Sequence, residues 1–356
     1  MSKTSRTMSY NSLLTSTREK YHKNGVPQDA IFNAIPTLEA LRRKKSFKTE
    51  ADGGEVIRIN LIEQANTNGK SYAGYEPANT TPQDEFTIAY DQWRQYSWTT
   101  PISGIEVFKN GGEKIFDLLA QKEEVTYMSA TENLNRDLWD IANITTSAGT
   151  AGNGGKNVNS IPLLIVKAPG TSNICHNITT ATGSNTWWAN RAFDAPDTVT
   201  GQQLIDTIRN AVNTCNRGRS TGKADLLVFD QVSYEMFESA LDRKVQYTQT
   251  KSATAGFETI TWKGAECLWD VYVPDCENGS NGGPDTTLTK GSIYILNSKA
   301  MKFYVGKGHD FSPTPFVDGT YNGQDAKLSM TLLYTQLVTD SRRNLGVIYE
   351  VPLSLS

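Results

Sequence analysis

Histidine and cysteine, from which many catalytic and metal sites are built, are scarce in this sequence. The 356 residues include three histidines and four cysteines. These are His22, His176, His309, Cys175, Cys215, Cys267 and Cys276. No Cys-x-x-Cys pair occurs, which argues against a zinc site and a disulfide framework. Cys175 and His176 are neighbours whose side chains diverge on an extended backbone, so their adjacency does not indicate a nucleophile and its base. We therefore expect no catalytic residue, no metal site, no cofactor and no enzyme activity.

A long apolar run is also missing. No stretch approaches the roughly 18 apolar residues that a membrane-spanning helix requires. The N-terminal residues MSKTSRTMSYNSLLTSTREKYHKNG have no apolar core of the kind found in secretory signals. The sequence therefore predicts synthesis in a cytoplasm and no membrane partner.

The net charge is only -3, but the charges are unevenly placed along the chain. Residues 1–50 carry ten basic and four acidic side chains. This excess suits an anionic partner, either nucleic acid or the acidic surface of another subunit. The candidate contact residues are Arg18, Lys20, Arg42, Arg43, Lys44 and Lys45. A solvated, partly disordered tail is the other interpretation of the same pattern.

The longest helical pattern covers residues 111–142. Apolar residues recur there at helical spacing, with charged and polar residues between them. They are Ile115, Leu118, Leu119, Val125, Met128, Leu134, Leu138 and Ile141. Neither Pro nor Gly occurs between Gly112 and Ile141, so Ile115–Ile141 is predicted to be one helix about 40 Å long. An earlier pattern, Ile31–Leu41, predicts a helix that Pro36 kinks or divides.

Two alternating runs, Glu55–Ile62 and Phe86–Trp93, predict the strands of a long hairpin. Residues Glu63–Glu85 join them and are polar and rich in Gly. A connection of this length is usually functional or disordered. Because it carries too little apolar surface to fold by itself, we expect the hairpin to lie on another surface.

Helices alternate with buried strands between about residues 160 and 300, which predicts an α/β unit. A flexible loop at Thr145–Asn159 is a candidate boundary before it. The clearest helix begins at a capping box, Thr200 and Gln203, and continues to Cys215. A second helix is expected around Tyr234–Leu241. Strands are expected at Ile161–Val166 (or a turn), Leu226–Phe229, Phe257–Trp262, Cys267–Val273 and Ser292–Leu296. Two closing strands, Leu328–Val338 and Leu345–Val351, are expected in one sheet. This sheet either pairs with the region of the long hairpin or lies beside the long helix.

Several stretches, taken in this order, resemble the major capsid proteins of tailed bacteriophages. GGEVIRINLIEQANTNGKSYAGYEP resembles the start of the extended loop of that family, and WTTPISGIEVFKNGGEKIFDLLAQK resembles the entry to its spine helix. NTWWANRAFDA, DTIRNAVNTCNRGRSTGKADLLVFDQVSYEMFESAL and YTQLVTDSRRNLGVIYEV resemble stretches typical of one phage capsid group. The resemblance covers nearly the whole chain from about Pro27 and implies the Hong Kong 97-type fold, which encapsulins share.

The resemblance implies an α+β fold with four parts. They are an N-terminal arm and kinked helix (1–50), an extended β-hairpin loop (51–98), a peripheral domain (99–160 and 297–356) with a spine helix at 111–142, and an α/β axial domain (161–296). Implied contacts between subunits lie in the extended loop, at Asn68, Lys70, Tyr72, Tyr75 and Glu76. Independently of the resemblance, Arg342 and Arg343 between the closing strands are candidates to meet phosphate or the carboxylates of a neighbouring subunit, and the second is the plainer interpretation. Some family members cross-link a loop lysine to a neighbour's asparagine, but Lys70 has no recognisable partner motif here.

The implied function is structural. Copies of the chain would assemble as hexamers and pentamers into an icosahedral shell around double-stranded DNA, bound without sequence specificity. Portal, scaffold and decoration proteins would be further partners, with assembly in the host bacterial cytoplasm and the virion as the final location. Two alternatives are open: an encapsulin-like cage holding a cargo protein, and a soluble carbohydrate-binding or hydrolytic protein using Trp187 and Trp188.

Overall fold

The computed structural model describes most of the chain between residues 35 and 354. The described residues are 35–44, 46–50, 54–109, 118–140, 152–170, 173–180, 185–217, 222–242, 260–274, 290–318 and 325–354. The chain divides into two compact units. Unit 1 comprises Met1–Asn33, Gln95–Leu134 and Gly308–Tyr334, and unit 2 comprises Ala34–Arg94, Asn135–Lys307 and Thr335–Ser356.

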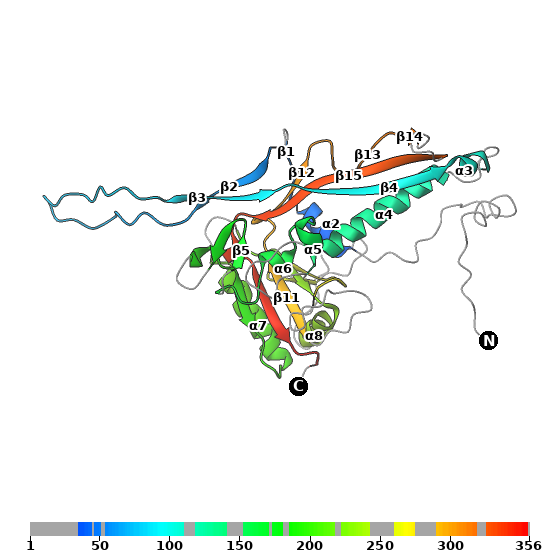
Figure 1. The fold of residues 1–356 in the computed structure, drawn as a ribbon. Helices are drawn as coiled ribbons and strands as arrows, with labels where there is room; N and C mark the ends of the chain where they lie inside the picture. The colour runs from blue at the N-terminus through cyan, green and yellow to red at the C-terminus, as the bar shows by residue number, and fades with distance from the viewer. Residues whose placement is uncertain are drawn as a thin grey trace. The chain divides into compact units, whose positions relative to one another are not determined.

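A six-stranded mixed sheet forms the core of unit 2. Its order is β7 (Arg191–Asp194), β16 (Gly346–Val351), β11 (Gly291–Leu296), β8 (Leu226–Phe229), β10 (Ala265–Trp269) and β9 (Ile260–Trp262). The helices α7 (Gly201–Cys215) and α8 (Gln231–Asp242) pack together and against β11 (Figure 1). The apolar residues of both helices and of the central strands form one buried cluster.

The local sequence explains these elements. All four residues of β8, Leu226–Phe229, are buried, as expected for a strand covered on both faces. The predicted capping box of α7 is confirmed, because the Thr200 hydroxyl accepts from the Gln203 N–H and the Gln203 side chain accepts from the Thr200 N–H. Leu204, Ile208 and other residues at helical spacing on α7 are buried. The predicted helix at Tyr234–Leu241 lies within α8.

The long strand β15 (Ala326–Thr339) supplies residues to both units. In unit 2, its C-terminal residues pair with β12 (Met301–Gly306), which also pairs with β1 (Phe47–Glu50). In unit 1, its N-terminal residues pair with β13 (Ser312–Pro313) and β14 (Val317–Asp318). The strand β4 (Arg94–Ser103), which the sequence does not predict, also pairs with β15.

The spine helix is shorter than predicted within the described residues. After the short helix α3 (Gly104–Lys109), α4 extends over Leu118–Leu138. Residues 110–117 and Ile141 lie outside the described residues, but Trp139 and Asp140 are not helical, so the helix does not continue to Ile141. Leu134 and Leu138 are fully buried as expected, whereas Val125 is 46% exposed. Polar residues dominate the middle of α4, so its apolar stripe is discontinuous.

Two sheet predictions need correction. Leu345–Val351 does not share a sheet with Leu328–Val338, because β16 pairs with β11 and β7. A 3-10 turn at Arg342–Asn344 separates β15 from β16, and the buried residues Gly346–Ile348 on both faces suit an interior strand. Ile161–Val166 is not a strand. Its residues Ile161–Leu164 form one helical turn, α6, in which the Leu163 N–H donates to the Ser160 hydroxyl.

Pro36 begins a helix. The helix α2 (Pro36–Arg43) has Pro36 in its first turn, where proline needs no intrahelical hydrogen bond, and residues 31–34 lie outside the described residues. The domain boundaries implied by the resemblance remain a prediction.

A buried carboxylate, Asp270, joins three segments of unit 2. Its oxygens accept hydrogen bonds from the Thr37 hydroxyl of α2 at 2.7 Å and from Asn135 Nδ2 of α4 at 3.0 Å. They also accept from Trp139 Nε1 at 3.3 Å and the Tyr272 N–H at 3.0 Å. Burial raises the pKa of Asp270, and these hydrogen bonds oppose the shift only in part.

This raised pKa predicts a pH dependence of stability. The folded protein holds the Asp270 proton at pH values where the unfolded chain has released it. The carboxyl therefore stabilises the fold most below about pH 4, and this contribution is lost as the pH rises through the folded pKa. Asp270→Asn should remove this group's contribution to the pH dependence of the free energy of unfolding. The stability advantage of the wild type over the variant should therefore shrink with rising pH. Urea unfolding of both proteins from pH 4 to 8 measures this change; parallel profiles of stability against pH would contradict the role of Asp270.

Candidate assembly interface

The predicted long hairpin is present and has two different faces. Strands β2 (Val56–Ile62) and β3 (Phe86–Gln92) pair antiparallel over their whole length. Directly paired residues of antiparallel strands lie on the same face. The inner face carries Ile57, Ile59, Leu61 and Ala89, all buried against Ile178, Trp188 and Val338. The hairpin is therefore attached to unit 2 by a small apolar core.

The outer face of the hairpin is exposed and carries four large apolar or aromatic side chains beside the polar residues Arg58, Asn60 and Gln92. We call it the outer stripe and define it by Ile62, Phe86, Ile88 and Tyr90. These side chains are 71%, 72%, 55% and 43% exposed, respectively. Ile62 and Phe86 are cross-strand partners, so they form one continuous apolar surface. Contiguous exposed apolar surface on a folded protein usually marks an interaction site.

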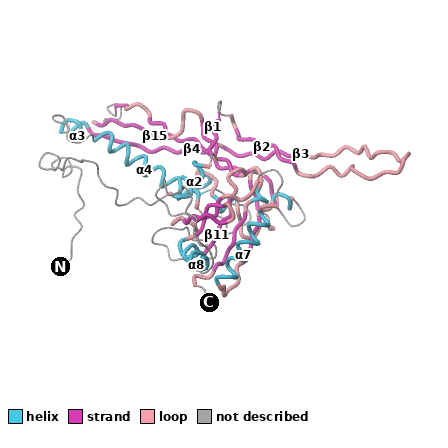
Figure 2. The backbone as a smooth tube through the Cα atoms, turned by 180° about the vertical axis from the view of Figure 1, so that it is seen from behind, coloured by secondary structure: helices cyan, strands magenta, loops and turns pink. Residues whose placement is uncertain are grey.

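The loop at Glu63–Glu85 continues the hairpin as two extended arms (Figure 2). The five residues predicted to contact another subunit all lie in it. Tyr72 is 71% exposed and Tyr75 is fully exposed, while Lys70 and Glu76 form an ion pair at 3.9 Å. Asn68 donates from Nδ2 to the Thr81 carbonyl of the opposite arm at 2.8 Å. Four of the five are therefore accessible, and Asn68 holds the arms together; their contact with a partner remains a prediction.

A buried polar cluster, which we call the Asp91 anchor, fixes the base of the hairpin. Asp91 lies on the inner face of β3. Its Oδ2 accepts from His176 Nδ1 at 2.8 Å and from Asn159 Nδ2 at 2.5 Å, and its Oδ1 accepts from Gln336 Nε2 at 3.2 Å. His176 Nε2 in turn accepts from the Thr339 N–H at 3.0 Å. The anchor thus ties β3 to three other segments of unit 2.

The local backbone brings His176 into this cluster. The short strands β5 (Asn173–Cys175) and β6 (Ile178–Thr180) are joined by His176 and Asn177, whose φ angles are 50° and 63°. Two consecutive positive φ angles are typical of the type I′ turns that connect tight hairpins. The His176 carbonyl also accepts from the Tyr90 N–H at 3.3 Å. Burial alone would raise the pKa of Asp91, but the hydrogen bonds that its carboxylate accepts from His176 and Asn159 lower it below the usual value.

Cys175 and His176 are not arranged for nucleophilic catalysis. Both are buried, and both ring nitrogens of His176 are hydrogen-bonded, to Asp91 and to the Thr339 N–H. Trp188 is also buried, and its Nε1 donates to the Cys175 carbonyl at 3.2 Å. Trp187 packs against the same core. The tryptophan pair therefore supports the base of the hairpin and does not form an open stacking platform for a sugar.

The basic residues at the end of α2 bind acidic residues of the same unit. Arg43 Nη2 lies 2.5 Å from Glu266 Oε2, and Lys44 Nζ lies 3.5 Å from Asp225 Oδ2 and 3.7 Å from the Glu266 carboxylate. These pairs connect α2 to the region of β8 and β10. Arg18, Lys20 and Lys45 lie outside the described residues. Contacts of Arg42 and the other basic residues with a partner or with DNA remain a prediction.

The prediction that Arg342 contacts a partner is wrong, because its side chain is fully buried. Its Nε donates to the Leu164 carbonyl at 2.7 Å, and its Nη2 donates to Asn173 Oδ1 at 2.8 Å. The pattern Arg342-Arg343 suggested an exposed turn, but only Arg343 is exposed. Arg343 remains a candidate contact.

The sequence did not reveal the Asp91 anchor. Asp91 follows an apolar strand pattern and would ordinarily be assigned to solvent, and its partners lie 68 to 245 positions away. A polar residue on the inner face of a strand, in register with Ile57, was the one available signal. Among the described residues, no group of three or more His, Cys, Asp or Glu side chains is placed to hold a metal ion. No helix in that part of the chain is long and apolar enough to cross a membrane.

Comparison with known proteins defines the class of fold. The chain matches no protein-family model and no curated protein sequence. A chain of the cyanophage A-1(L) capsid is 13% identical, with a TM-score of 0.58 over 95% of this chain and 99% of that one. The SrpI encapsulin of Synechococcus elongatus is 12% identical, with a TM-score of 0.57 over 96% of each chain. The capsid protein of Myoviridae phage XM1 is 12% identical, with a TM-score of 0.53 over 94% and 97%.

Near-complete coverage of both chains shows that the whole architecture is shared. The fold is that of phage capsid proteins and of an encapsulin. More specifically, the predicted α+β Hong Kong 97-type fold of tailed-phage major capsid proteins is confirmed.

The Asp91 anchor predicts a loss of stability when its carboxylate is removed. Asp91→Asn replaces one acceptor oxygen by a donor that faces other donors, so buried partners lose hydrogen bonds. We expect the free energy of unfolding to fall by about 2 kcal/mol. The Tyr90 amide should also exchange faster with solvent, since its acceptor His176 loses its support. Urea unfolding and hydrogen exchange of unassembled subunits measure both effects. Asp84→Asn, in the exposed loop, is the matched control; equal effects of the two variants would contradict the anchor.

Proposed function

We propose that the chain is the major capsid protein of a tailed bacteriophage. Copies associate as hexamers and pentamers into an icosahedral shell around double-stranded DNA. The observation that supports this proposal most strongly is a fold shared over nearly the full length with phage capsid chains. The hairpin adds a specific reason to expect self-association, because it exposes the outer stripe and a long loop that its own chain does not cover.

The proposed contact between copies begins at the hairpin. Burying a Phe or Ile side chain is worth about 1.5–3 kcal/mol, and the outer stripe holds four large side chains. The loop adds polar groups and exposed tyrosines, of the kind enriched at protein interfaces. A contact that joins different surfaces of two copies can be repeated from copy to copy around an axis. It produces a closed ring when the rotation between neighbouring copies divides a full turn evenly, as in rings of five or six subunits. The boundaries 1–50, 51–98, 99–160 with 297–356, and 161–296 are part of this proposal.

Partners other than the chain itself follow from the same proposal. Packaged DNA would meet basic residues through its phosphates, without base recognition, and this contact would weaken as salt rises. Portal, scaffold and decoration proteins would complete the particle. Assembly would take place in the host bacterial cytoplasm, and the mature location would be the virion.

An encapsulin-like cage is the second candidate, because an encapsulin shares the fold over 96% of both chains. Negative-stain microscopy of the expressed protein tests both candidates together. A stable 39.3 kDa monomer under all assembly conditions would exclude both. Native particles then separate them: nuclease-protected double-stranded DNA supports the capsid, and a protein cargo without DNA supports the cage.

Removal of apolar surface from the outer stripe should weaken assembly. In Phe86→Ser with Ile88→Ser, two exposed side chains become polar, so the isolated subunit should keep its urea midpoint. Each contact between copies should lose about 3–6 kcal/mol for the two side chains together, which raises the protein concentration needed for assembly about a hundredfold or more. Light scattering against protein concentration measures the shift. Ile174→Ser, at a side chain 40% exposed on β5, is the matched control. Equal assembly of both variants would refute the role of the stripe.

Deletion of the loop should separate folding from assembly. A variant lacking residues 64–82 retains β2, β3 and the Asp91 anchor, so we expect a folded subunit with native circular dichroism. Electron microscopy should show few or no closed shells. Normal shells from this variant would refute the loop's part in the contact.

A further inference from the structure

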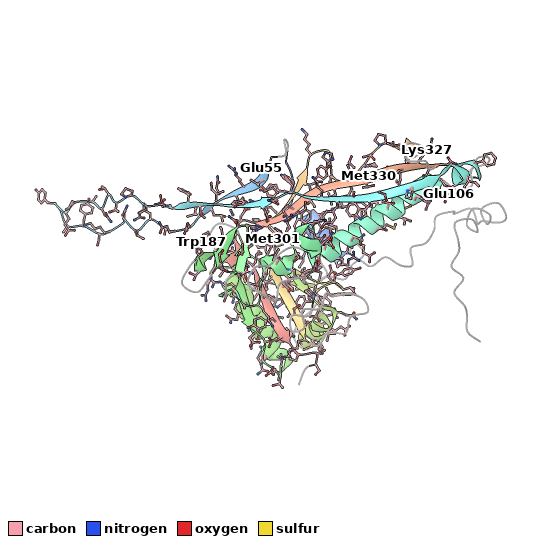
Figure 3. The ribbon with its side chains drawn as sticks, viewed as in Figure 1. Glu55, Glu106, Trp187, Met301, Lys327 and Met330 are labelled. Atoms are coloured by element: carbon pink, nitrogen blue, oxygen red, sulfur yellow. The ribbon has the colours of Figure 1, made fainter. Side chains whose placement is uncertain are left out.

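The two arms of the loop are held together by side-chain amides. Backbone pairing continues only one step beyond β2 and β3, where the Glu63 N–H donates to the Glu85 carbonyl at 2.9 Å. Further out, Gln64 Nε2 donates to the Asp84 carbonyl at 2.6 Å. Gln83 and Asn68 make the remaining links between the arms. Figure 3 shows the side chains along both arms of the loop. We call this set of residues, Gln64, Thr67, Asn68, Thr81 and Gln83, the amide zipper.

Gln83 has the largest number of these links. Its Oε1 accepts from the Thr67 N–H at 3.0 Å. Its Nε2 donates to Thr67 Oγ1 at 2.6 Å and to Asn68 Oδ1 at 2.9 Å. Asn68 completes the zipper by donating to the Thr81 carbonyl at 2.8 Å. A carboxamide carries donors and an acceptor on one planar group, so Gln83 can bridge the opposite arm's backbone and side chains together.

The sequence explains why side chains, and not backbone groups, make the hydrogen bonds between the two arms. Pro77 and Pro82 lie in the second arm, and proline has no N–H to donate to a strand ladder. Gly69 and Gly74 further weaken any strand in this region. The Asn, Gln and Thr side chains supply the donors and acceptors that the backbone lacks.

An extended loop that is ordered before contact has an advantage in assembly. A flexible loop loses conformational freedom when it binds, and that loss weakens the contact. The zipper is exposed to water, so its bonds bias the loop toward the extended form without making it rigid. Gln83 lies between the arms and is only partly exposed, unlike the fully exposed Tyr75 near the tip. Gln83 therefore acts on the opposite arm more than on a partner.

We propose that Gln83 is a positioning residue for self-assembly, which holds the loop arms together and presents the loop tip to a second copy of the chain. This inference rests on the proposed shell-forming function. Gln83 affects the shape of the free loop and, through that shape, the rate at which two copies associate.

Two variants of Gln83 test the proposal. Gln83→Ala removes the three links that Gln83 makes and leaves those of Gln64 and Asn68. Gln83→Glu keeps the size and the acceptor for the Thr67 N–H but loses the Nε2 donor. We expect the Thr67 amide of unassembled Gln83→Ala to exchange about fivefold faster in millisecond hydrogen exchange. The assembly rate, followed by light scattering, should fall about three- to tenfold, with a smaller fall for Gln83→Glu. Finished shells should look the same as those of the wild type.

Thr80→Ala, at an exposed position of the same loop, is the matched control and should leave both readouts unchanged. Unchanged exchange at Thr67 in Gln83→Ala would overturn the zipper. Faster exchange with a wild-type assembly rate would overturn the positioning role while leaving the shell function intact. Failure of the wild type itself to assemble would instead refute the proposed function, and the exchange measurement would still decide whether Gln83 orders the loop.

Discussion

The unequal burial of the two faces of the β2–β3 hairpin is the constraint on which the proposed assembly depends. Ile57, Ile59 and Leu61 face inward and are covered by the same chain, whereas the cross-strand pair Ile62 and Phe86 faces solvent. Because side chains alternate along a strand, one hairpin can be attached to its own subunit and remain apolar on the other side. A chain that folds alone seldom leaves such a surface open.

Buried polar groups decide how the parts of unit 2 are held. Asp91 accepts from three side chains and Asp270 from three side chains and one backbone N–H. Arg342 donates to a carbonyl and to Asn side chains. A buried polar group is costly unless it is hydrogen-bonded, so each of these residues favours one arrangement of its neighbours. The base of the hairpin is therefore defined by direction-dependent bonds as well as by apolar packing.

The low identity to proteins of the same fold has a physical explanation. The neighbours share 12–13% of residues with this chain but nearly its whole length. An apolar core tolerates many substitutions when its volume and pattern are kept. The specific contacts identified here, such as the Asp91 anchor and the amide zipper, depend on individual side chains.

The sequence by itself determined several local elements, and its resemblance to a known family indicated the class of fold. Alternation identified β2 and β3, a capping box identified α7, and the polar run between the hairpin strands identified an extended loop. Only the tertiary structure decided that β16 joins β11 and β7, that Arg342 is buried, and that Asp91 meets His176, Asn159 and Gln336. The reason is that periodic patterns encode which face of an element is buried, whereas partners distant in sequence are selected by the packing of the whole chain.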